Sequence, residues 1–272
     1  MAKKSLGQNF LVDGRVAARI VGALAPGADE TVIEIGPGRG ALTGRLLELA
    51  GRVVAVEFDR DLIPVLEERF AGRENFRLVH DDALAADFCE LILPARASRV
   101  VANLPYNIST AILQRLIGQR ACLTEFVLML QREVVERMTA PAGSSERGYL
   151  SVLVEATCEA ERLFDVAPAS FRPVPKVWST VVRLRPRELP AADVRDEPLF
   201  RQLVGAGFAQ KRKTILNNLR AAPAALRATI ESLGGERPLL EASDLDPSRR
   251  AESLTLEEWV RLAETLRGTV EG

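Results

Sequence analysis

The strongest constraint on the fold comes from a strand that ends in the sequence Asn103-Leu104-Pro105-Tyr106. The apolar run Val100–Ala102 before it is typical of a buried strand. Pro105 can neither continue a strand ladder nor allow a helix to begin at once. The pattern therefore places a carboxamide, a stiff turn and an aromatic ring at the C-terminal end of a central strand. Open α/β sheets bind their ligands at that edge.

This tetrad suits the methylation of an exocyclic amine on an extruded base. The Asn103 side-chain oxygen and a backbone carbonyl of the turn can accept both N–H groups of adenine, which localises the nitrogen lone pair. Tyr106 offers a flat face for the base, a contact worth about 1–3 kcal/mol in single-strand binders. The alternative is an ordinary Asn-Pro turn with Tyr106 in the core. The tetrad alone leaves both interpretations open.

Strands and helices alternate along most of the chain, which predicts an α/β fold with a mostly parallel sheet. A first helix is expected from Asp13, and the helix after the tetrad is expected to be capped by Ser109 or Thr110. The loop Thr139–Arg147 is expected to be mobile. The predicted strands are Thr31–Ile35, Arg52–Glu57, Phe76–His80, Arg99–Ala102, Glu125–Gln131, Leu150–Ala160 and Thr180–Leu184.

Charge and cysteine content exclude several classes of protein. Lys and Arg number 36 against 37 Asp and Glu in 272 residues, so any nucleic-acid surface must be local. No apolar signal core or membrane-spanning run is found. The cysteines Cys89, Cys122 and Cys158 are odd in number and scattered, and the lone histidine, His80, has no partner motif. We expect a reduced, cytoplasmic protein without a disulfide or a metal site.

A glycine-rich turn follows the first predicted strand of the sheet. Glycines in Gly36-Pro-Gly38-Arg-Gly40 allow a ligand to approach the backbone closely, and Glu57 at the end of the next strand can accept both hydroxyls of a ribose. An acid after the third strand, Asp81 or Asp82, can bind the amino group of an adenine ring, although the pair also suits a plain loop. Because Gly36-x-Gly38-x-x-Ala41 also fits the dinucleotide fingerprint, an NAD enzyme stays open here. Such an enzyme requires a hydride-handling residue near Asn103, and the sequence has none there.

Two further stretches have both a functional and a structural interpretation. In the Pro-rich segment Phe171–Ser179, Phe171 can stack on the base opposite Tyr106 and Lys176 can hold a phosphate, or the segment is a hairpin loop with a core phenylalanine. The basic, amide-rich arm before Asp13 either folds over a ligand or is a frayed terminus.

The pattern beyond Arg185–Pro190 is entirely helical. We therefore predict a larger α/β domain over residues 1–185 and a small helical domain over 191–272. The run Lys211-Arg212-Lys213 is either a solvated face or, with Arg183, Arg185 and Arg220, a grip on RNA phosphates.

Taken together, these stretches resemble the ribosomal RNA adenine N6,N6-dimethyltransferases of the bacterial KsgA type over nearly the whole chain. The motifs that carry the resemblance are Gly7–Leu11, Glu34–Gly38, Glu57, Asp82-Ala83, Asn103–Thr110, Gln131–Val135, Phe171–Val177 and Lys211–Asn218.

The resemblance implies a Rossmann-like class I methyltransferase domain with a seven-stranded sheet, plus a helical C-terminal domain. It implies dimethylation of two adjacent adenosines in the 3′-terminal hairpin loop of 16S rRNA, within the small (30S) ribosomal subunit, late in its assembly. A monomer is expected. The family uses S-adenosylmethionine, and contacts with this cofactor are implied for Asn9, Leu11, Gly36, Gly38, Glu57, Asp82 and Asn103. Contacts with the target adenine are implied for Asn103, Leu104, Tyr106 and Phe171.

Some positions depart from the family pattern. Trp178 stands where Asp is usual, Arg39 stands where a small apolar residue is common, and Gly148-Tyr149 is in the reverse order. Two alternatives lie close to the main interpretation. One is the related group that methylates a large-subunit rRNA adenine and confers antibiotic resistance, and the other is a non-catalytic ribosome assembly factor.

Overall fold

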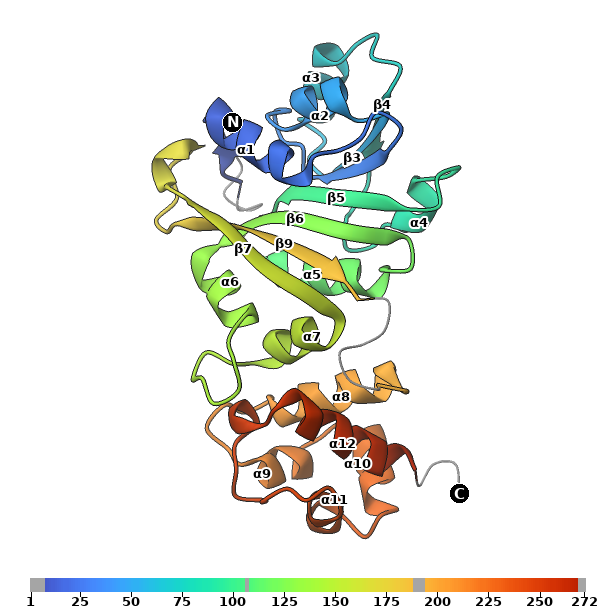
Figure 1. The fold of residues 1–272 in the computed structure, drawn as a ribbon, viewed down its shortest axis with the longest axis vertical. Coiled ribbons are helices and arrows are strands. Elements are labelled where there is room, and N and C mark those ends of the chain that lie inside the picture. Colours follow the sequence, from blue (N-terminus) through green and yellow to red (C-terminus); the bar gives the residue numbers. More distant parts are fainter. Residues whose placement is uncertain (1–7, 106–107, 188–193, 269–272) are drawn as a thin grey trace. The chain divides into compact units, whose positions relative to one another are not determined.

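The computed structural model describes residues 8–105, 108–187 and 194–268, and the chain forms two compact units. The first comprises Met1–Val135 and Glu159–Pro186, and the second comprises Glu136–Cys158 and Arg187–Gly272 (Figure 1). The segment 136–158 thus belongs with the C-terminal helices, whereas the sequence-based boundary placed it in the first domain. No helix in the described ranges is long and apolar enough to cross a membrane.

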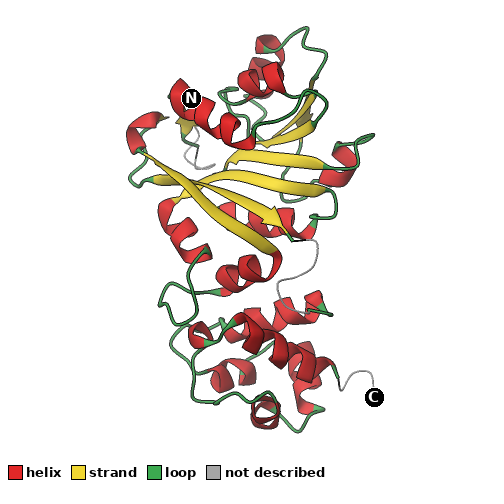
Figure 2. Cartoon of the chain, in the orientation of Figure 1, coloured by secondary structure: helices red, strands yellow, loops and turns green. Residues whose placement is uncertain are grey.

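The first unit is built on a seven-stranded sheet with the strand order β4-β3-β2-β5-β6-β9-β7 (Figure 2). Parallel pairing joins β4, β3, β2, β5 and β6, and β9 is antiparallel to β6. Every residue of β2 is buried, as expected for a central parallel strand covered on both faces. The strands are β2 (Thr31–Ile35), β3 (Arg52–Glu57), β4 (Phe76–His80), β5 (Ser98–Asn103), β6 (Leu123–Gln131), β7 (Cys158–Val166) and β9 (Ser179–Pro186).

Helices cover both faces of this sheet. One face packs against α1 (Gly14–Leu24), α2 (Thr43–Leu49) and α3 (Ile63–Arg69) in a single apolar cluster with residues such as Val53 and Val101. Asp13 caps α1, as predicted, by accepting from the backbone N–H groups of the first turn. The remaining helices of this unit are α4 (Phe88–Leu91) and α5 (Ser109–Gly118), and α6 (Arg132–Met138) leads into the second unit.

Helix α5 buries a stripe formed by Ile112, Leu113, Leu116 and Ile117. Its cap was predicted incorrectly. The cap position is Ile108, which makes no side-chain cap hydrogen bond, because the helix begins with Ser109 already inside its first turn.

The strand predicted over Leu150–Ala160 is wrong for most of its length. Tyr149–Thr157 is helix α7, and only from Cys158 does the chain continue as β7. The residues Leu150–Val154 are all buried, and a run of residues buried on every side lacks the periodicity that separates a helix from a strand. The helix start is held by Ser151, whose Oγ accepts from the Gly148 N–H at 2.9 Å and donates to the Arg137 carbonyl at 2.6 Å.

The predicted mobility of Thr139–Arg147 is also corrected, because a buried arginine fixes this loop in the structure. Arg147 is only 2% exposed, pairs with Glu155 at 2.6 Å and donates to the Ala140 carbonyl at 3.1 Å. Gly143 N–H donates to the Glu252 carbonyl at 2.8 Å, which adds a second attachment within the same unit.

The expectation that the cysteines remain unpaired is wrong. Cys89 in α4 and Cys122 just before β6 form a disulfide across 33 positions of sequence, and Cys158 is buried outside that bond. The side chain of Gln119 holds the two segments together, because its Oε1 accepts from Phe88 N–H at 2.7 Å and its Nε2 donates to the Ala86 carbonyl at 3.0 Å. Cysteine spacing alone does not reveal this proximity.

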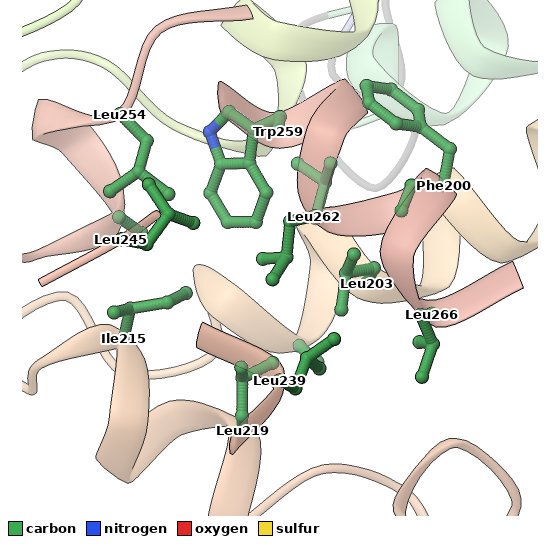
Figure 3. Packing of buried hydrophobic residues seen from close by; sticks show 14 of the residues in the cluster. Phe200, Leu203, Ile215, Leu219, Leu239, Leu245, Leu254, Trp259, Leu262 and Leu266 are labelled. Carbon is green, nitrogen blue, oxygen red and sulfur yellow. The ribbon is translucent and has the colours of Figure 1, made fainter. Parts of the chain in front are cut away.

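The second unit has its own apolar core. Trp259 is wholly buried in it, among leucines that include Leu254 and Leu262 (Figure 3). It stacks on Phe208 at 5.6 Å between ring centroids and packs against Gly207, where a Cβ would lie 2.3 Å from the indole. Val152 and Ala156 of α7 join the same core. The C-terminal helices are α8 (Glu197–Gly207), α9 (Ile215–Arg220), α10 (Ala224–Glu231), α11 (Glu236–Ala242) and α12 (Leu256–Arg267), with short 3-10 turns at Pro168–Ser170 (η2, in the first unit) and Ala251–Ser253 (η3). Thr255 and Glu258 form a capping box at the start of α12.

Candidate active site

A cavity of about 250 Å³ lies at the C-terminal edge of the parallel strands of the first unit. Since β4, β3, β2 and β5 are neighbours in the sheet, the residues that end or follow them meet at this edge. The cavity is open to the bend at Asn103. Its lining includes all the residues predicted to contact the cofactor: Asn9, Leu11, Gly36, Gly38, Glu57, Asp82 and Asn103.

The glycine turn between β2 and α2 has a backbone that favours glycine. Gly36, Gly38 and Gly40 have φ values of 65°, 61° and 79°, in the left-handed region. A Cβ on Gly36 would meet nothing within 4 Å, so the space beside its backbone is open to a ligand.

Glu57 lies at the end of β3 and is 5% exposed. Its carboxylate accepts from Gly38 N–H at 3.1 Å and from Asp59 N–H at 2.8 Å, so it fixes both the glycine turn and the following loop. Burial raises the pKa of Glu57, and the backbone N–H groups of Asp59 and Gly38 partly oppose that rise.

Glu34 is a cavity-lining carboxylate that was not among the predicted site residues. It is 2% exposed, and its Oε2 accepts from Thr43 Oγ1 at 2.6 Å. Burial, with a smaller contribution from the nearby Glu57 charge, raises the pKa of Glu34 to about 7. The sequence did not indicate a role for Glu34, because it lies inside a predicted strand. Strand residues alternate between the two faces of a sheet, and the sequence does not show which of them border the cavity.

The segment that follows the N-terminal lysines folds over the cavity. Strand β1 (Phe10–Leu11) pairs antiparallel with β8 (Phe171–Arg172), and Gln8 Nε2 donates to Asp59 Oδ2 at 2.8 Å. Residues 1–7, which include Lys3 and Lys4, lie outside the described residues. From residue 8 onward, the arm is therefore packed against the cavity and is not a frayed terminus.

Asn103 ends β5, and one side-chain hydrogen bond fixes its orientation. Its Nδ2 donates to the Asn9 carbonyl at 3.1 Å. Because a carbonyl can only accept, the amide nitrogen must face Asn9, and Oδ1 remains as the acceptor. Leu104 is buried and donates its N–H to the Met129 carbonyl at 3.2 Å, and Pro105 lines the cavity. Tyr106 lies outside the described residues.

Asp82 follows β4 and is half-buried at the cavity wall. Its Oδ1 accepts from Leu84 N–H at 2.9 Å, which fixes the loop on which it lies. His80 is an exposed residue at the end of the strand and is not part of the cavity lining, as its lack of a partner motif predicted.

The predicted stacking role of Phe171 does not match its position in this structure. Phe171 is wholly buried, lies in the apolar cluster beneath α1 together with Val166 and Leu11, and is not part of the cavity lining. Its pairing with Leu11 in β1 directs the side chain into the core. Lys176, in the same loop, is exposed.

Only some of the basic side chains predicted to bind RNA phosphates are exposed and outside ion pairs of the fold. Arg183 and Arg185 are used within the fold, since both form ion pairs with the buried Glu125, at 3.5 and 2.8 Å. Lys211, Arg212 and Lys213 are exposed on a turn of the second unit. Asn218 fixes that turn by donating to the carbonyls of Gly207, at 2.6 Å, and Gln210, at 3.2 Å.

A family model described as ribosomal RNA adenine dimethylase matches residues 1–266 of the chain. The chain belongs to the ribosomal RNA adenine dimethylase family. Membership makes this dimethylase an S-adenosylmethionine-dependent rRNA methyltransferase, and it confirms the methyltransferase interpretation of the glycine turn.

Curated relatives match the dimethylase over almost their full length. The protein named ribosomal RNA small subunit methyltransferase A from Saccharophagus degradans is 44% identical over 266 residues, which cover 97% of this chain and 94% of the relative. The protein of the same name from Geobacter sulfurreducens is 44% identical over 267 residues, which cover 97% and 95%.

Solved structures confirm the class I methyltransferase fold. A dimethyladenosine transferase from Plasmodium falciparum matches with a TM-score of 0.79 at 26% identity, covering 96% of this chain and 98% of the other. The 23S rRNA methyltransferase ErmE matches with a TM-score of 0.66 at 27% identity, covering 95% and 100%.

Proposed function

We propose that this dimethylase transfers methyl groups to N6 of two adjacent adenosines in the 3′-terminal hairpin loop of small-subunit rRNA. The observation that carries the proposal is the Asn103 bend, which opens into the same cavity as the glycine turn, Glu57 and Asp82. The relatives named small subunit methyltransferase A support the substrate, at 44% identity against 27% for ErmE.

The cavity suits S-adenosylmethionine in charge and shape. Its wall carries carboxylates, among them Glu34, Glu57 and Asp82, which complement a ligand with a sulfonium and an ammonium group. Glu57 would hold the ribose hydroxyls, Asp82 the adenine amino group, and the backbone at Gly36 and Gly38 the amino-acid portion. Asn9 and Leu11 would cover the ligand from the arm. When bound, the cofactor supplies an electrophilic methyl group.

The chain's own residues orient the target amine. The Asn103 Oδ1 atom, fixed by the bond from Nδ2 to the Asn9 carbonyl, accepts one N6–H of the flipped adenine. A backbone carbonyl of the Leu104–Pro105 turn accepts the other, and Tyr106 stacks on the ring. These bonds direct the nitrogen lone pair toward the methyl group. No general base is needed before attack, because the N–H becomes acidic only as the nitrogen gains charge. Catalysis is therefore mainly positioning.

The second unit and the loop at Lys176 would bind rRNA beyond the target loop. The exposed side chains of Lys176, Lys211, Arg212 and Lys213 suit contacts with phosphates. We place the reaction on the small ribosomal subunit, late in its assembly, in the cytoplasm where ribosomes are built, with the protein acting as a monomer. In this division, methyl transfer belongs to the sheet-bearing unit, residues 1–135 and 159–186, and ribosome contact belongs to the helical unit, residues 136–158 and 187–272.

The test is mass mapping of dimethyladenosine in rRNA after incubation with labelled cofactor and, separately, small or large subunits. We expect label at two adjacent adenosines of the small subunit. Asn103→Ala should reduce methyl transfer by at least a hundredfold while the fold is retained. Gln202→Ala, which removes an exposed carboxamide in α8, is the matched control and should have normal activity. Label only in large subunits, or near-normal turnover by Asn103→Ala, would refute the proposal.

A further inference from the structure

A second hollow, of about 650 Å³, lies beside the cofactor cavity in the first unit. The two share part of their walls, since Phe10, Leu11, Arg39 and Ala41 line both. The hollow is formed by the N-terminal arm, the start of α1, the glycine turn, α2 and the end of α3. Nothing in the methyl-transfer geometry uses it.

Four arginines surround this hollow, and we call them the arginine group: Arg39, Arg45, Arg69 and Arg73. All four are exposed, and they come from the glycine turn, α2, α3 and the loop after α3. Two carboxylates, Asp13 and Glu48, line the same hollow, so the arginines leave an excess of two positive charges. In a chain whose net charge is -1, this is a marked local concentration.

Packing beneath the arginine group holds its members in place. The ring of Phe70 lies against Gly40, where a Cβ would be 2.6 Å from Phe70 Cε2, so the end of α3 meets the glycine turn directly. Arg69 Nη1 donates to the Arg39 carbonyl across that junction. The Arg39 guanidinium lies 5.1 Å from the centroid of the Phe10 ring. The glycine turn that lines the cofactor cavity therefore also positions the arginines.

The carboxylate of Asp13 is directed toward the start of α1. Its Oδ1 accepts from the N–H groups of Arg15 and Val16 at the start of α1, at 2.9 and 3.4 Å. An anionic partner that enters the hollow thus meets several guanidinium groups that can each form paired hydrogen bonds with phosphate.

We propose that the arginine group binds the phosphates of the RNA strand next to the target adenosine. A strand is favoured over a single small anion because the guanidinium groups come from four separate segments around a hollow larger than the cofactor cavity. The shared wall at Phe10 and Arg39 places the hollow next to the cavity that also contains Asn103. The inference rests on the proposed function, and it deepens it by naming where the flanking backbone lies.

The test uses the full-length protein and measures RNA binding separately from catalysis. Fluorescence anisotropy with a labelled 3′-terminal hairpin of small-subunit rRNA, at graded salt, compares the wild type with the double variant Arg45→Gln/Arg73→Gln. Loss of two phosphate contacts should raise Kd about tenfold near physiological salt and reduce the slope of log K against log salt by roughly 1.5. The matched control, Arg96→Gln/Arg237→Gln, removes two exposed arginines elsewhere and should bind as the wild type does.

Calorimetric titration with S-adenosylmethionine should give the same affinity for the double variant as for the wild type, because Arg45 and Arg73 are not part of the cofactor-cavity lining. An unchanged salt slope, equal losses in the control variant, or a parallel loss of cofactor affinity would overturn the inference. If the wild type fails to methylate small subunits, the proposed function fails. The comparison of salt slopes would still decide whether the arginine group binds RNA.

Discussion

Replacing Glu34 with glutamine should stabilise this protein by an amount that increases with pH. Glu34 is 2% exposed, lies in the central strand β2, and accepts a 2.6 Å hydrogen bond from Thr43 Oγ1. Its burial, with the Glu57 charge nearby, raises the pKa of the carboxyl from 4.5 to about 7. Glutamine keeps the shape and still accepts from Thr43, but it cannot ionise.

The size of the effect follows from proton linkage. Between about pH 4.5 and 7 the folded state keeps a proton on Glu34 that the unfolded chain has lost, so the free energy of unfolding falls as the pH rises through this window. Above about pH 7 the loss is complete. The gap between 4.5 and about 7, at about 1.4 kcal/mol per pH unit, corresponds to roughly 3 kcal/mol.

We therefore expect Glu34→Gln to be up to roughly 3 kcal/mol more stable than the wild type at pH 8, and within about 1 kcal/mol of it at pH 5. Urea unfolding of the cofactor-free protein followed by circular dichroism, at half-unit steps from pH 5 to 8, measures both. The control is Glu67→Gln, an exposed carboxylate on α3, for which no pH-dependent difference is expected. A Glu34→Gln effect that is the same at pH 5 and pH 8, or a destabilised variant at pH 8, would refute the reasoning.

Two further predictions test the backbone of the glycine turn and the disulfide. Gly40→Ala should lower the free energy of unfolding by about 2–4 kcal/mol, because it combines a left-handed φ of 79° with a Cβ only 2.6 Å from the Phe70 ring. The control is Gly72→Ala, which has a φ of 76° and nothing within 4 Å of the Cβ, and which should lower it by only about 1–2 kcal/mol. Equal losses for the two variants in thermal or urea unfolding would count against the clash with Phe70. Reducing the Cys89–Cys122 bond, which spans 33 positions, should lower the free energy of unfolding by up to about 4 kcal/mol. If all three cysteines react with a thiol reagent in the unfolded, unreduced protein, the bond is absent.

The sequence correctly identified the elements that form the cofactor cavity. The runs at Thr31–Ile35 and Arg52–Glu57 predicted strands, and the structure has them with the same bounds. The glycine turn, Glu57 and Asn103 can be recognised from the local sequence, because each lies at or directly after the end of a predicted strand. Parallel strands then bring such ends to one edge of a sheet by geometry alone.

Contacts between distant segments were beyond the sequence. The bond between Cys89 and Cys122 depends on Gln119 joining α4 to the segment before β6, and no spacing rule encodes it. The partners of Arg183 and Arg185 likewise became visible only when Glu125 was found buried beside them.

Local sequence patterns are sufficient to identify the residues that end the strands, and hence the functional groups that lie at the edge of the sheet. The packing of distant segments determines which other side chains reach the cavity and which are buried in the core. Phe171 pairs with Leu11 and points into the core, whereas Glu34 faces the cavity with a raised pKa. The physical reason is that local periodicity fixes the direction of each strand, while burial, charge and hydrogen-bond partners come from segments remote in the chain.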